Sequence, residues 1–460
     1  MKLLVNGNAV YIPLKDKSVN LVVTSPPYFG LRSYSTSRWV GGDETCDHVA
    51  NPNATKVFGN PEFNENRPSR EKTKMKGYYY KDVCLKCGAI RIDEQIGLEE
   101  TIDEYVEKMV MVGREIWRVL RDDGIFFLNL GDSYNGTGNV SGEKQFENNK
   151  QGTNVGSRGF KGKSIDTLKP KDKMFIPERT AMALQADGWW VRRDIIWAKG
   201  CSFNYKGGST MPESCKDRPT TSHEYVYMLT KSKQYYYDYY GVLEDSVDLE
   251  GSMKRYKTEF LAGDKHESGG YSAEGARHTK GMKEFNGKRN LRSVWAINTA
   301  SYPGSHYATF PPDLIEPMIL AGCPEKVCAE CGAPYERVVE SVAGTSTKCP
   351  KTDLAFQARG GTGEKKTGTV GMSGGGRTDG HSKLLGWQPT CDCNAETKPG
   401  VVFDPFVGSG TTVMVANKHG RKGIGMDLSY EYLNVNARER LLYGQYVFDE
   451  EGNKQFTLGV

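Results

Sequence analysis

The sequence predicts an α/β protein built on a mostly parallel sheet, with further segments inserted between the elements of that sheet. Two apolar segments, residues 19–23 and 401–403, have the composition of buried strands. Each runs directly into a turn of special chemistry, Pro-Pro after the first and Gly-Ser-Gly after the second. Between them, a helical pattern over residues 98–120 passes through Asp-Gly into the apolar residues 125–130. Such helix–turn–strand units are typical of parallel sheets.

Length and composition restrict the class of protein. The 460 residues allow two or three domains, and a hydrophobic fraction of 37% with a mean hydropathy of −0.59 indicates a soluble protein with long polar insertions. No segment approaches the roughly 18 apolar residues of a membrane span, and residues 1–7 become polar too early for a signal peptide. We therefore expect a cytoplasmic protein whose 11 cysteines are not disulfide-bonded. The net charge of +4 does not by itself indicate a nucleic-acid partner.

The first motif is Thr-Ser-Pro-Pro-Tyr, residues 24–28, at the end of the first apolar strand. Proline fixes φ and cannot donate to a ladder, so the strand ends in a rigid turn. This turn offers the Ser25 hydroxyl and backbone carbonyls as acceptors beside the Tyr28 ring, at the sheet edge where open α/β sheets bind ligands. Acceptors next to an aromatic face suit a flat substrate with an exocyclic amino group. A plain Pro-Pro loop with a packing tyrosine is the simpler alternative.

The segment between the two motifs alternates between regular and polar stretches. Thr101 with Glu104 predicts a capping box at the start of the first long helix. Asp132 follows the strand at residues 125–130 and either caps the next element or belongs to the site. Residues 135–173 are basic and rich in Gly, Asn and Ser, which indicates a loop that binds a polyanion or is simply solvated. A helix is expected at residues 178–187, and strands are expected at residues 190–197, 224–229 and 294–297. A further helix is expected to begin with the prolines at 311–312 in its first turn.

Two Cys-x-x-Cys-Gly turns have the spacing of zinc knuckles, because the glycine permits a tight turn between two thiolates. The first is preceded by a Cys-Asp-His segment and the second is followed by Cys-Asp-Cys. Cys349 and His381 compete for a place in the second group, and metal-free turns are the alternative for both. The predicted zinc ligands are Cys46, His48, Cys84 and Cys87 in the first group, and Cys328, Cys331, Cys391 and Cys393 in the second.

The second motif is Asp-Pro-Phe-Val-Gly-Ser-Gly-Thr-Thr, residues 404–412, between the strand at 401–403 and a helix expected at 413–419. A strand, a glycine-rich turn and a helix N-terminus together form a cofactor-binding unit. A second strand, residues 422–427, ends in Asp427, where an acid accepts both hydroxyls of a ribose. The turn has neither the Gly-Lys-Ser/Thr of a P-loop nor the full Gly-x-Gly-x-x-Gly pattern.

These two motifs resemble the catalytic and cofactor motifs of the S-adenosylmethionine-dependent DNA amino-methyltransferases. The catalytic motif precedes the cofactor motif, as in the permuted β group of that family. Residues 131–134, 217–225 and 310–314 are similar to further family segments, and paired cysteine knuckles occur in a phage-associated subgroup. One departure is Gly7-Asn8, where the family would have Gly-Asp near the cofactor adenine. The resemblance covers the ordered parts of nearly the whole chain.

The resemblance implies a seven-stranded, Rossmann-like, mostly parallel sheet in permuted order. Tyr28 would stack on a base flipped out of the duplex, while Ser25 and the Pro26 carbonyl would accept hydrogen bonds from its amino group. Holding the amine hydrogens in this way aims the nitrogen lone pair at the methyl group. The implied catalytic residues are Ser25, Pro26, Pro27 and Tyr28. The implied S-adenosylmethionine contacts are Asp404, Pro405, Phe406, Gly408, Ser409, Gly410, Thr411 and Asp427.

The serine form of the motif is usually linked to N4 of cytosine, and N6 of adenine is the alternative. Expected partners are double-stranded DNA and a cognate restriction endonuclease, in a bacterial cell or phage-infected host. An RNA or protein methyltransferase, or a non-catalytic zinc protein that binds nucleic acid, are rival classes. We expect a catalytic half (1–34 and 96–231), a cofactor half (296–325 and 396–445), zinc-knuckle insertions (35–95 and 326–395), a target-recognition region (232–295) and a C-terminal tail (446–460).

Overall fold

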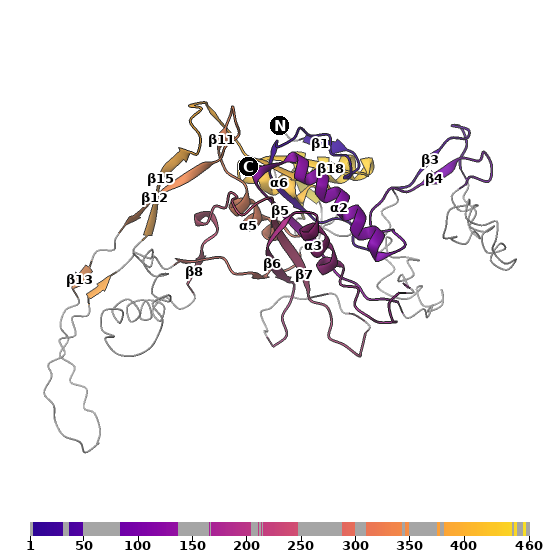
Figure 1. Ribbon diagram of the computed structural model, residues 1–460, viewed down its shortest axis with the longest axis horizontal. Coiled ribbons are helices and arrows are strands. Elements are labelled where there is room, and N and C mark those ends of the chain that lie inside the picture. The colour runs from indigo at the N-terminus through magenta and orange to yellow at the C-terminus, as the bar shows by residue number, and fades with distance from the viewer. Residues whose placement is uncertain are drawn as a thin grey trace, which may run out of the picture. The chain divides into compact units, whose positions relative to one another are not determined.

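A computed structural model describes two compact units of the chain (Figure 1). The first unit comprises Met1–Tyr237, Ser293–Glu325 and Pro399–Val460, and the second comprises Asp238–Arg292 and Lys326–Lys398. Most of the expected basic loop, much of the expected recognition region and Cys349 lie outside the described residues. The described residues are 3–30, 36–48, 83–136, 165, 167–203, 210, 213, 215–246, 288–299, 310–342, 346–348, 375–377, 381–443, 446–448 and 454–456.

The first unit is organised around one sheet in the order β1-β18-β17-β2-β5-β7-β6-β10. Neighbouring strands are parallel except at β7, which is antiparallel to both β5 and β6. The expected mostly parallel sheet is confirmed, and its eighth strand is the short β10 at one edge. The bounds are β1 Leu3–Asn6, β2 Val19–Thr24, β5 Leu120–Leu130, β6 Trp190–Ala198, β7 His223–Thr230, β10 Val294–Ala296, β17 Val401–Asp404 and β18 Lys422–Asp427.

Strand order brings the two motifs together. β17 lies directly beside β2, with Phe403 opposite Val22 in a parallel register. Parallel neighbours end at the same edge of a sheet, so the proline turn after β2 and the glycine-rich turn after β17 are adjacent. The N-terminal strand β1 pairs with β18, with Asn6 opposite Asp427. The first strand therefore lies beside the strands of the cofactor half, although residues 1–34 were grouped with the catalytic half.

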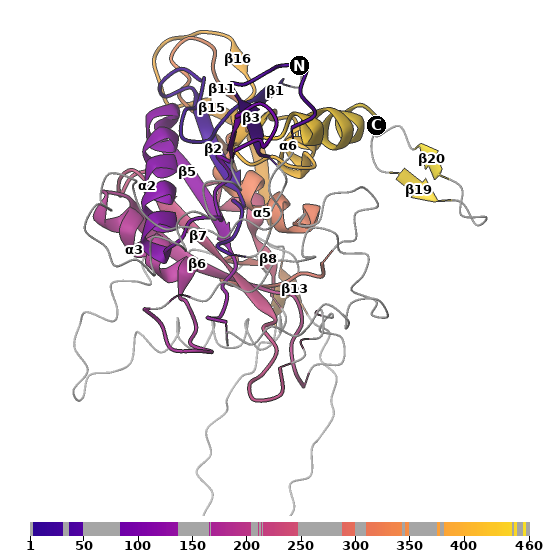
Figure 2. The same ribbon diagram turned by 90° about the vertical axis from the view of Figure 1, so that its right-hand side faces the viewer.

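Helices cover both faces of this sheet (Figure 2). Val22 and Phe126 belong to the same buried cluster as the apolar residues of α2 and α3. On the opposite face, Gly322 at the end of α5 lies so close to β2 that an added Cβ would be 2.8 Å from Leu21. α6 packs on α5 and on β18. The helices are α2 Ile102–Val119, α3 Ile176–Ala186, α5 Pro312–Gly322, α6 Thr411–Lys418 and α7 Arg438–Tyr443, with a π-helix at Tyr432–Ala437 and a 3-10 turn at Tyr240–Val242.

The predicted capping box at the start of α2 is confirmed. The Glu104 amide donates to Thr101 Oγ1 at 3.1 Å, and the Thr101 amide donates to the Glu104 carboxylate at 3.2 Å. We expect Thr101→Ala to lower the free energy of unfolding of the first unit by about 1 kcal/mol, measured by urea titration. Because the two bonds act as one cap, adding Glu104→Ala should cost much less than its single effect. Full additivity would contradict this.

The Asp-Gly segment after α2 is not the turn that its composition predicts. The helix ends at Val119, and β5 begins at Leu120 and runs through the segment. The β2–β5 register shifts there, because Val19 pairs with Leu120 and Leu21 already pairs with Ile125. The extra residues form a bulge. An added Cβ at Gly124 would lie 2.8 Å from the Asn20 carbonyl oxygen, so the glycine is needed for this bulge.

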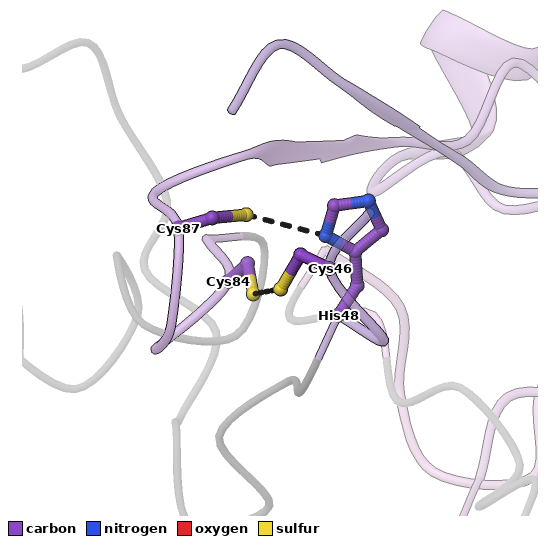
Figure 3. Close-up of side chains that lie close together, drawn as sticks. All are labelled: Cys46, His48, Cys84 and Cys87. Carbon is purple, nitrogen blue, oxygen red and sulfur yellow. Dashed lines mark hydrogen bonds between the residues drawn. The ribbon is translucent and has the colours of Figure 1, made fainter. Parts of the chain in front are cut away.

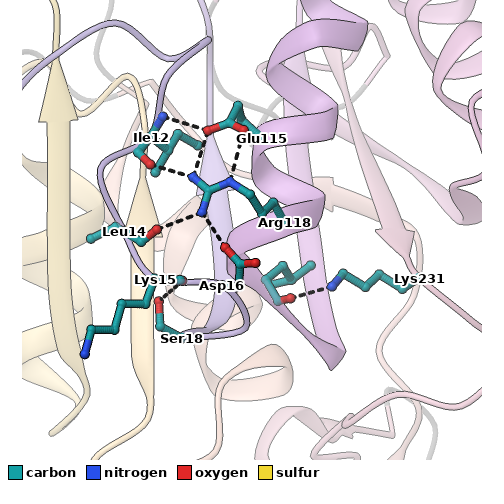
Figure 4. Close-up of polar contacts among 9 residues, drawn as sticks. Ile12, Leu14, Lys15, Asp16, Ser18, Glu115, Arg118 and Lys231 are labelled. Carbon is teal, nitrogen blue, oxygen red and sulfur yellow. Dashed lines mark hydrogen bonds and ion pairs between the residues drawn. The ribbon is translucent and has the colours of Figure 1, made fainter.

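Arg118, in the last turn of α2, fastens the loop between β1 and β2 (Figure 4). Its guanidinium donates to the carbonyls of Ile12 at 2.6 Å and Leu14 at 2.9 Å. It also forms ion pairs with Asp16 at 2.7 Å and Glu115 at 2.8 Å. The Ile12 carbonyl also accepts from the Leu14 amide at 2.9 Å, so the arginine adds a second donor there and supplies one to Leu14. These bonds hold the loop that leads into β2 against the helix.

The second unit contains a long antiparallel hairpin, β12 Tyr335–Val342 with β15 His381–Pro389. None of the helices in the described part of the chain has the length and apolar character needed to cross a membrane. In both units, the strands outside the main sheet and this hairpin form short antiparallel pairs. These are β3 Arg38–Val40 with β4 Ile90–Ile92, β8 Glu244–Asp245 with β9 Lys288–Arg289, β11 Val327–Cys328 with β16 Thr397–Lys398, β13 Ser346–Lys348 with β14 Gly375–Arg377, and β19 Tyr446–Phe448 with β20 Lys454–Phe456.

Candidate active site

Ser25 lies at the end of β2 with its hydroxyl held by two neighbours. The Ser25 hydroxyl is 3.2 Å from the Tyr28 hydroxyl, and the Asn129 amide donates to Ser25 Oγ at 3.2 Å. Tyr28 in turn donates to Glu224 Oε2 at 2.7 Å, so its oxygen accepts the Ser25 hydrogen. A hydroxyl has one hydrogen and two lone pairs. The Asn129 amide also donates to the Tyr28 hydroxyl at 2.7 Å, and it has only two hydrogens for its three neighbouring acceptors. The Ser25 hydrogen is directed to Tyr28 and at most one lone pair to Asn129, which leaves at least one lone pair for an incoming N–H group.

Glu224 and Lys199 complete this network at the start of β7 and the end of β6. Glu224 Oε2 also accepts from the Asn129 amide at 2.9 Å, and Glu224 Oε1 is ion-paired with Lys199. The Lys199 ammonium lies 4.6 Å from the centre of the Trp197 ring. Since β7 is antiparallel to its neighbours, its first residues lie at the same edge as the ends of β2 and β5. The carboxylate therefore fixes both the Tyr28 hydroxyl and the orientation of the Asn129 amide.

The two proline carbonyls of the motif differ in their surroundings. The Tyr105 hydroxyl donates to the Pro27 carbonyl at 3.1 Å, which ties the turn to α2. Within the described part of the chain no residue donates to the Pro26 carbonyl. The buried Oδ1 of Asn129 also has no partner among these residues. The site thus holds acceptors without donors, beside a tyrosine ring that is partly exposed.

Asn129, Glu224 and Lys199 were not predicted as site residues. Asn129 is the one polar residue in the otherwise apolar run Ile-Phe-Phe-Leu-Asn-Leu of β5, and it is only 4% exposed. A polar side chain in a fully buried strand needs hydrogen-bond partners. An asparagine within an apolar strand was therefore the sequence feature that could have indicated this residue. Glu224 had no such signal, because strand pairing alone brings it to Tyr28.

Gly131, directly after β5, lies against the Tyr28 ring. An added Cβ would be 2.6 Å from Tyr28 Cε2, so the ring would have to move. Because the Tyr28 hydroxyl is held by Glu224 and Asn129, the shift would also disturb Ser25. We expect Gly131→Ala to lower the rate of the proposed reaction roughly 10- to 100-fold, with cofactor affinity unchanged, in single-turnover assays. A wild-type rate would show that the ring position does not matter.

Asp132 is the helix cap that one of the two interpretations predicted. Its Oδ1 accepts from the amide of Ile176 at 3.0 Å, at the N-terminus of α3, and from the amide of Ser133 at 2.8 Å. Its other oxygen is ion-paired with Lys173 at 3.2 Å. This arrangement fixes the chain that follows β5 against α3.

The glycine-rich turn after β17 is held in shape by Asp427. The Gly408 amide donates to Asp427 Oδ2 and the Ser429 amide to Oδ1, both at 2.9 Å. Gly410 has φ +83°, a conformation that favours glycine. Burial raises the pKa of Asp427, and the backbone donors oppose that rise. Each carboxylate oxygen keeps a further lone pair, so the group is able to accept a ribose hydroxyl as well.

Asp404 connects the two motifs. It is buried, and its Oδ1 accepts from Thr24 Oγ1 at 2.5 Å and from the Phe406 amide at 3.0 Å, while Oδ2 accepts from Thr412 Oγ1 at 2.6 Å. Thr24 is the residue before Ser25, so this carboxyl group joins the end of β2 to the glycine-rich turn and to α6. Burial raises the pKa of Asp404 to about 6.

The side chains of Ser409 and Thr411 point to the protein rather than outward. Arg440, on α7, donates to Ser409 Oγ at 2.9 Å and to Thr411 Oγ1 at 2.8 Å. Pro405 is also buried, and among residues 404–411 Phe406 alone is partly exposed. Sequence reasoning did not find Arg440. The implied cofactor contacts of these residues stay predictions. The structure shows that Arg440 supports the turn through the Ser409 and Thr411 hydroxyls.

The predicted metal ligands come together in two clusters, in which the potential ligand atoms all lie within 4.8 Å of one another. The first cluster is in the first unit and the second cluster in the second unit. The first cluster is Cys46, His48, Cys84 and Cys87, and the second cluster is Cys328, Cys331, Cys391 and Cys393.

Fold and site together define an α/β protein in which a glycine-rich turn lies beside a proline turn that offers hydrogen-bond acceptors. The chain belongs to the DNA methylase family, whose model matches residues 19–328 and 394–438. It is 28% identical to the type II methyltransferase M.Cfr9I of Citrobacter freundii, over 92% of this chain and 81% of that protein. It is 30% identical to the type II methyltransferase M.SmaI of Serratia marcescens, over 76% and 77%.

Solved structures show weaker likeness. The PvuII DNA methyltransferase, titled cytosine-N4-specific, aligns over 97% of this chain and 88% of its own at 13% identity, with a TM-score of 0.43. A complex of M1.HpyAVI with S-adenosylmethionine aligns over 96% and 100% at 12% identity, with a TM-score of 0.34.

Proposed function

We propose that this chain transfers a methyl group from S-adenosylmethionine to the N4 amino group of cytosine in double-stranded DNA. The observation that carries the proposal is the Ser25 hydroxyl, whose hydrogen and one lone pair are engaged by Tyr28 and Asn129. The remaining lone pair accepts one hydrogen of the target amine, and the Pro26 carbonyl accepts the other. Because an aryl amine is a poor nucleophile, orienting its hydrogens exposes the lone pair.

The cofactor fits the residues present. S-adenosylmethionine supplies an electrophilic methyl group when bound. Asp427 offers its remaining lone pairs to the ribose hydroxyls, and the backbone of Gly408 and Gly410 permits close approach. Phe406, the partly exposed side chain of the turn, would border the bound molecule. The Thr24–Asp404 hydrogen bond holds this turn next to Ser25.

The target base has to leave the duplex to reach a turn at the sheet edge. Tyr28 then stacks on the base, with its ring orientation held by Glu224 and Gly131. The serine favours cytosine, and N6 of adenine is the second candidate because the same acceptors suit its amino group. The type II relatives support a restriction–modification role with a cognate endonuclease, and a cytoplasmic location.

Nucleoside mass spectrometry of plasmid DNA from cells expressing the chain tests the proposal, with Ser25→Ala expressed in parallel. We expect N4-methylcytosine with the wild type and none with the variant. N6-methyladenine would leave the site intact and overturn the choice of base. Labelled methyl groups on RNA or protein, with none on DNA, would overturn the proposed substrate.

A further inference from the structure

Both cysteine clusters are built on the same turn. Residues 84–89 and 328–333 share the sequence Cys-x-x-Cys-Gly-Ala. In each, the amide of the first cysteine donates to the alanine carbonyl, at 2.7 Å and 2.8 Å, and the glycine amide donates to the carbonyl of that cysteine at 3.0 Å. The glycines Gly88 and Gly332 both have φ +73°. Two segments from separate units thus present a pair of thiols in the same way.

The first cluster has the spacing of a tetrahedral site (Figure 3). Cys46 Sγ lies 3.8 Å from Cys84 Sγ, and Cys87 Sγ lies 3.3 Å from His48 Nδ1. Zinc–sulfur and zinc–nitrogen bonds of about 2.3 and 2.0 Å place tetrahedral ligands about 3.8 Å apart for two sulfurs and about 3.5 Å for sulfur and nitrogen. A disulfide needs about 2.05 Å between sulfurs, so these thiols are not bridged.

The surroundings fix the ligands of the first cluster in place. The His48 ring stacks on Trp39, with centroids 5.2 Å apart, while its Nδ1 faces the thiols. The Lys86 amide donates to Cys84 Sγ at 3.4 Å, a contact that favours the thiolate. An added Cβ at Gly42 would be 2.7 Å from Cys87 Sγ, so the backbone is packed directly against the cluster.

The second cluster is closed by strand pairing. β11 pairs with β16, which places Cys328 opposite Thr397, and the Ala329 amide donates to the Glu396 carbonyl at 2.8 Å. The competing ligand His381 pairs with Val342, at the far end of the hairpin from Pro389. Strand rise puts about 25 Å between residues 381 and 389. The backbone of His381 therefore lies far along the hairpin from Pro389, which precedes Cys391 by two residues.

Hydrophobic burial in these segments is too small to hold the ligands together. β3 and β4 have three residues each and are largely exposed. β11 and β16 have two residues each, and of these two strands only β11 is buried. Isolated two-stranded pairs of this size are not stable in water. The two ligand pairs of the first cluster, Cys46 with Cys84 and His48 with Cys87, are 38 and 39 residues apart in the chain. A cross-link is needed to hold such segments together, and a metal ion provides one.

We propose that each cluster binds one zinc ion, through three thiolates and His48 Nδ1 in the first unit and through four thiolates in the second. Four protein ligands fill a tetrahedral coordination shell, so neither ion has an open position for a substrate. The two ions are structural cross-links at the bases of the two insertions. This proposal is independent of the methyl-transfer proposal, because its readout is metal content.

The full chain, purified without metal-affinity resin, is expected to contain two zinc ions by elemental analysis and native mass spectrometry. Cys46→Ser with Cys84→Ser should leave one zinc, as should Cys328→Ser with Cys331→Ser. The matched control is Cys201→Ser, an exposed cysteine outside both clusters, which should keep two. His48→Ala should weaken the first site, and His48→Cys should restore it if the residue is a ligand.

Cobalt(II) substitution of the wild-type chain distinguishes the two sites, and this first readout needs no variant. Two tetrahedral spectra are expected, and His48→Cys should convert the first into one like the second. A chain with eleven free thiols and no metal, bound iron in place of zinc, or masses lowered by disulfide formation would each overturn the proposal. A single zinc in the wild type would overturn it for the cluster that is empty.

Discussion

Ser25→Ala is expected to lower the rate of methyl transfer by roughly 10²- to 10³-fold while leaving the affinity for S-adenosylmethionine unchanged. The expected size is that of removing one oriented hydrogen-bonding group from a transition state. The variant removes the acceptor whose free lone pair the network of Tyr28 and Asn129 directs toward the amine. It leaves the hydrogen bonds of the glycine-rich turn in place, because among the described residues the Ser25 hydroxyl bonds to Tyr28 and Asn129 and not to that turn.

Single-turnover transfer of labelled methyl groups measures the rate, and calorimetry measures donor binding. The matched control is Ser18→Ala, at the residue directly before β2, where the hydroxyl donates to the Lys15 carbonyl (Figure 4). That variant should behave as wild type. A Ser25→Ala enzyme with full activity would show that the hydroxyl does not hold the amine, and weakened donor binding would place Ser25 in the cofactor site.

Local patterns were sufficient to predict the sheet and the location of both motifs. The apolar run of β2, the amphipathic pattern of α2 and the run from β17 to β18 each carry their own periodicity, and the structure has them within a few residues of the expected bounds. The same reasoning failed at Asp-Gly, because those residues favour a turn locally. In the sheet, pairing with β2 extends β5 through them as a bulge.

Long-range contacts in the site were not predictable in this way. Glu224 reaches Tyr28 only because β7 runs antiparallel between β5 and β6. Arg440 lies on α7, 31 residues after Ser409 in the chain, and donates to its hydroxyl only because α7 packs near the turn. Neither partner has a sequence signal near the motif that it supports. Cysteine spacing indicated both clusters, whereas only the hairpin register separated His381 from Cys391.

Replacing Asp404 is expected to have the largest effect on stability. Asp404→Ala leaves buried donors on Thr24, Thr412 and the Phe406 amide without an acceptor, and we expect the free energy of unfolding to fall by about 2–4 kcal/mol at neutral pH. Asp404→Asn keeps an acceptor for Thr24 and offers an amide to Thr412 Oγ1, so it should cost much less. Urea titration followed by tryptophan fluorescence measures both variants.

The pH dependence separates the charge of Asp404 from its hydrogen bonds. Burial raises its pKa to about 6 in the native state, compared with 3.8 for an ordinary aspartate. Between these values the folded chain holds a proton that the unfolded chain has lost, so stability falls as pH rises. This group alone should remove about 2 kcal/mol of unfolding free energy between pH 4 and 6, out of about 3 kcal/mol over the whole titration. The stabilising contribution of Asp404 is fully present below pH 3.8, the pKa of an ordinary aspartate.

Asp404→Asn has no titrating group at this position, so its stability should fall less steeply than that of the wild type over the same pH range. Asp194→Asn, at an exposed aspartate of β6, is the matched control and should follow the wild-type curve. Parallel curves for the wild type and Asp404→Asn would mean that Thr24, Thr412 and the Phe406 amide keep the carboxylate charged despite its burial. The hydrogen bonds would then outweigh desolvation at the junction between the two motifs.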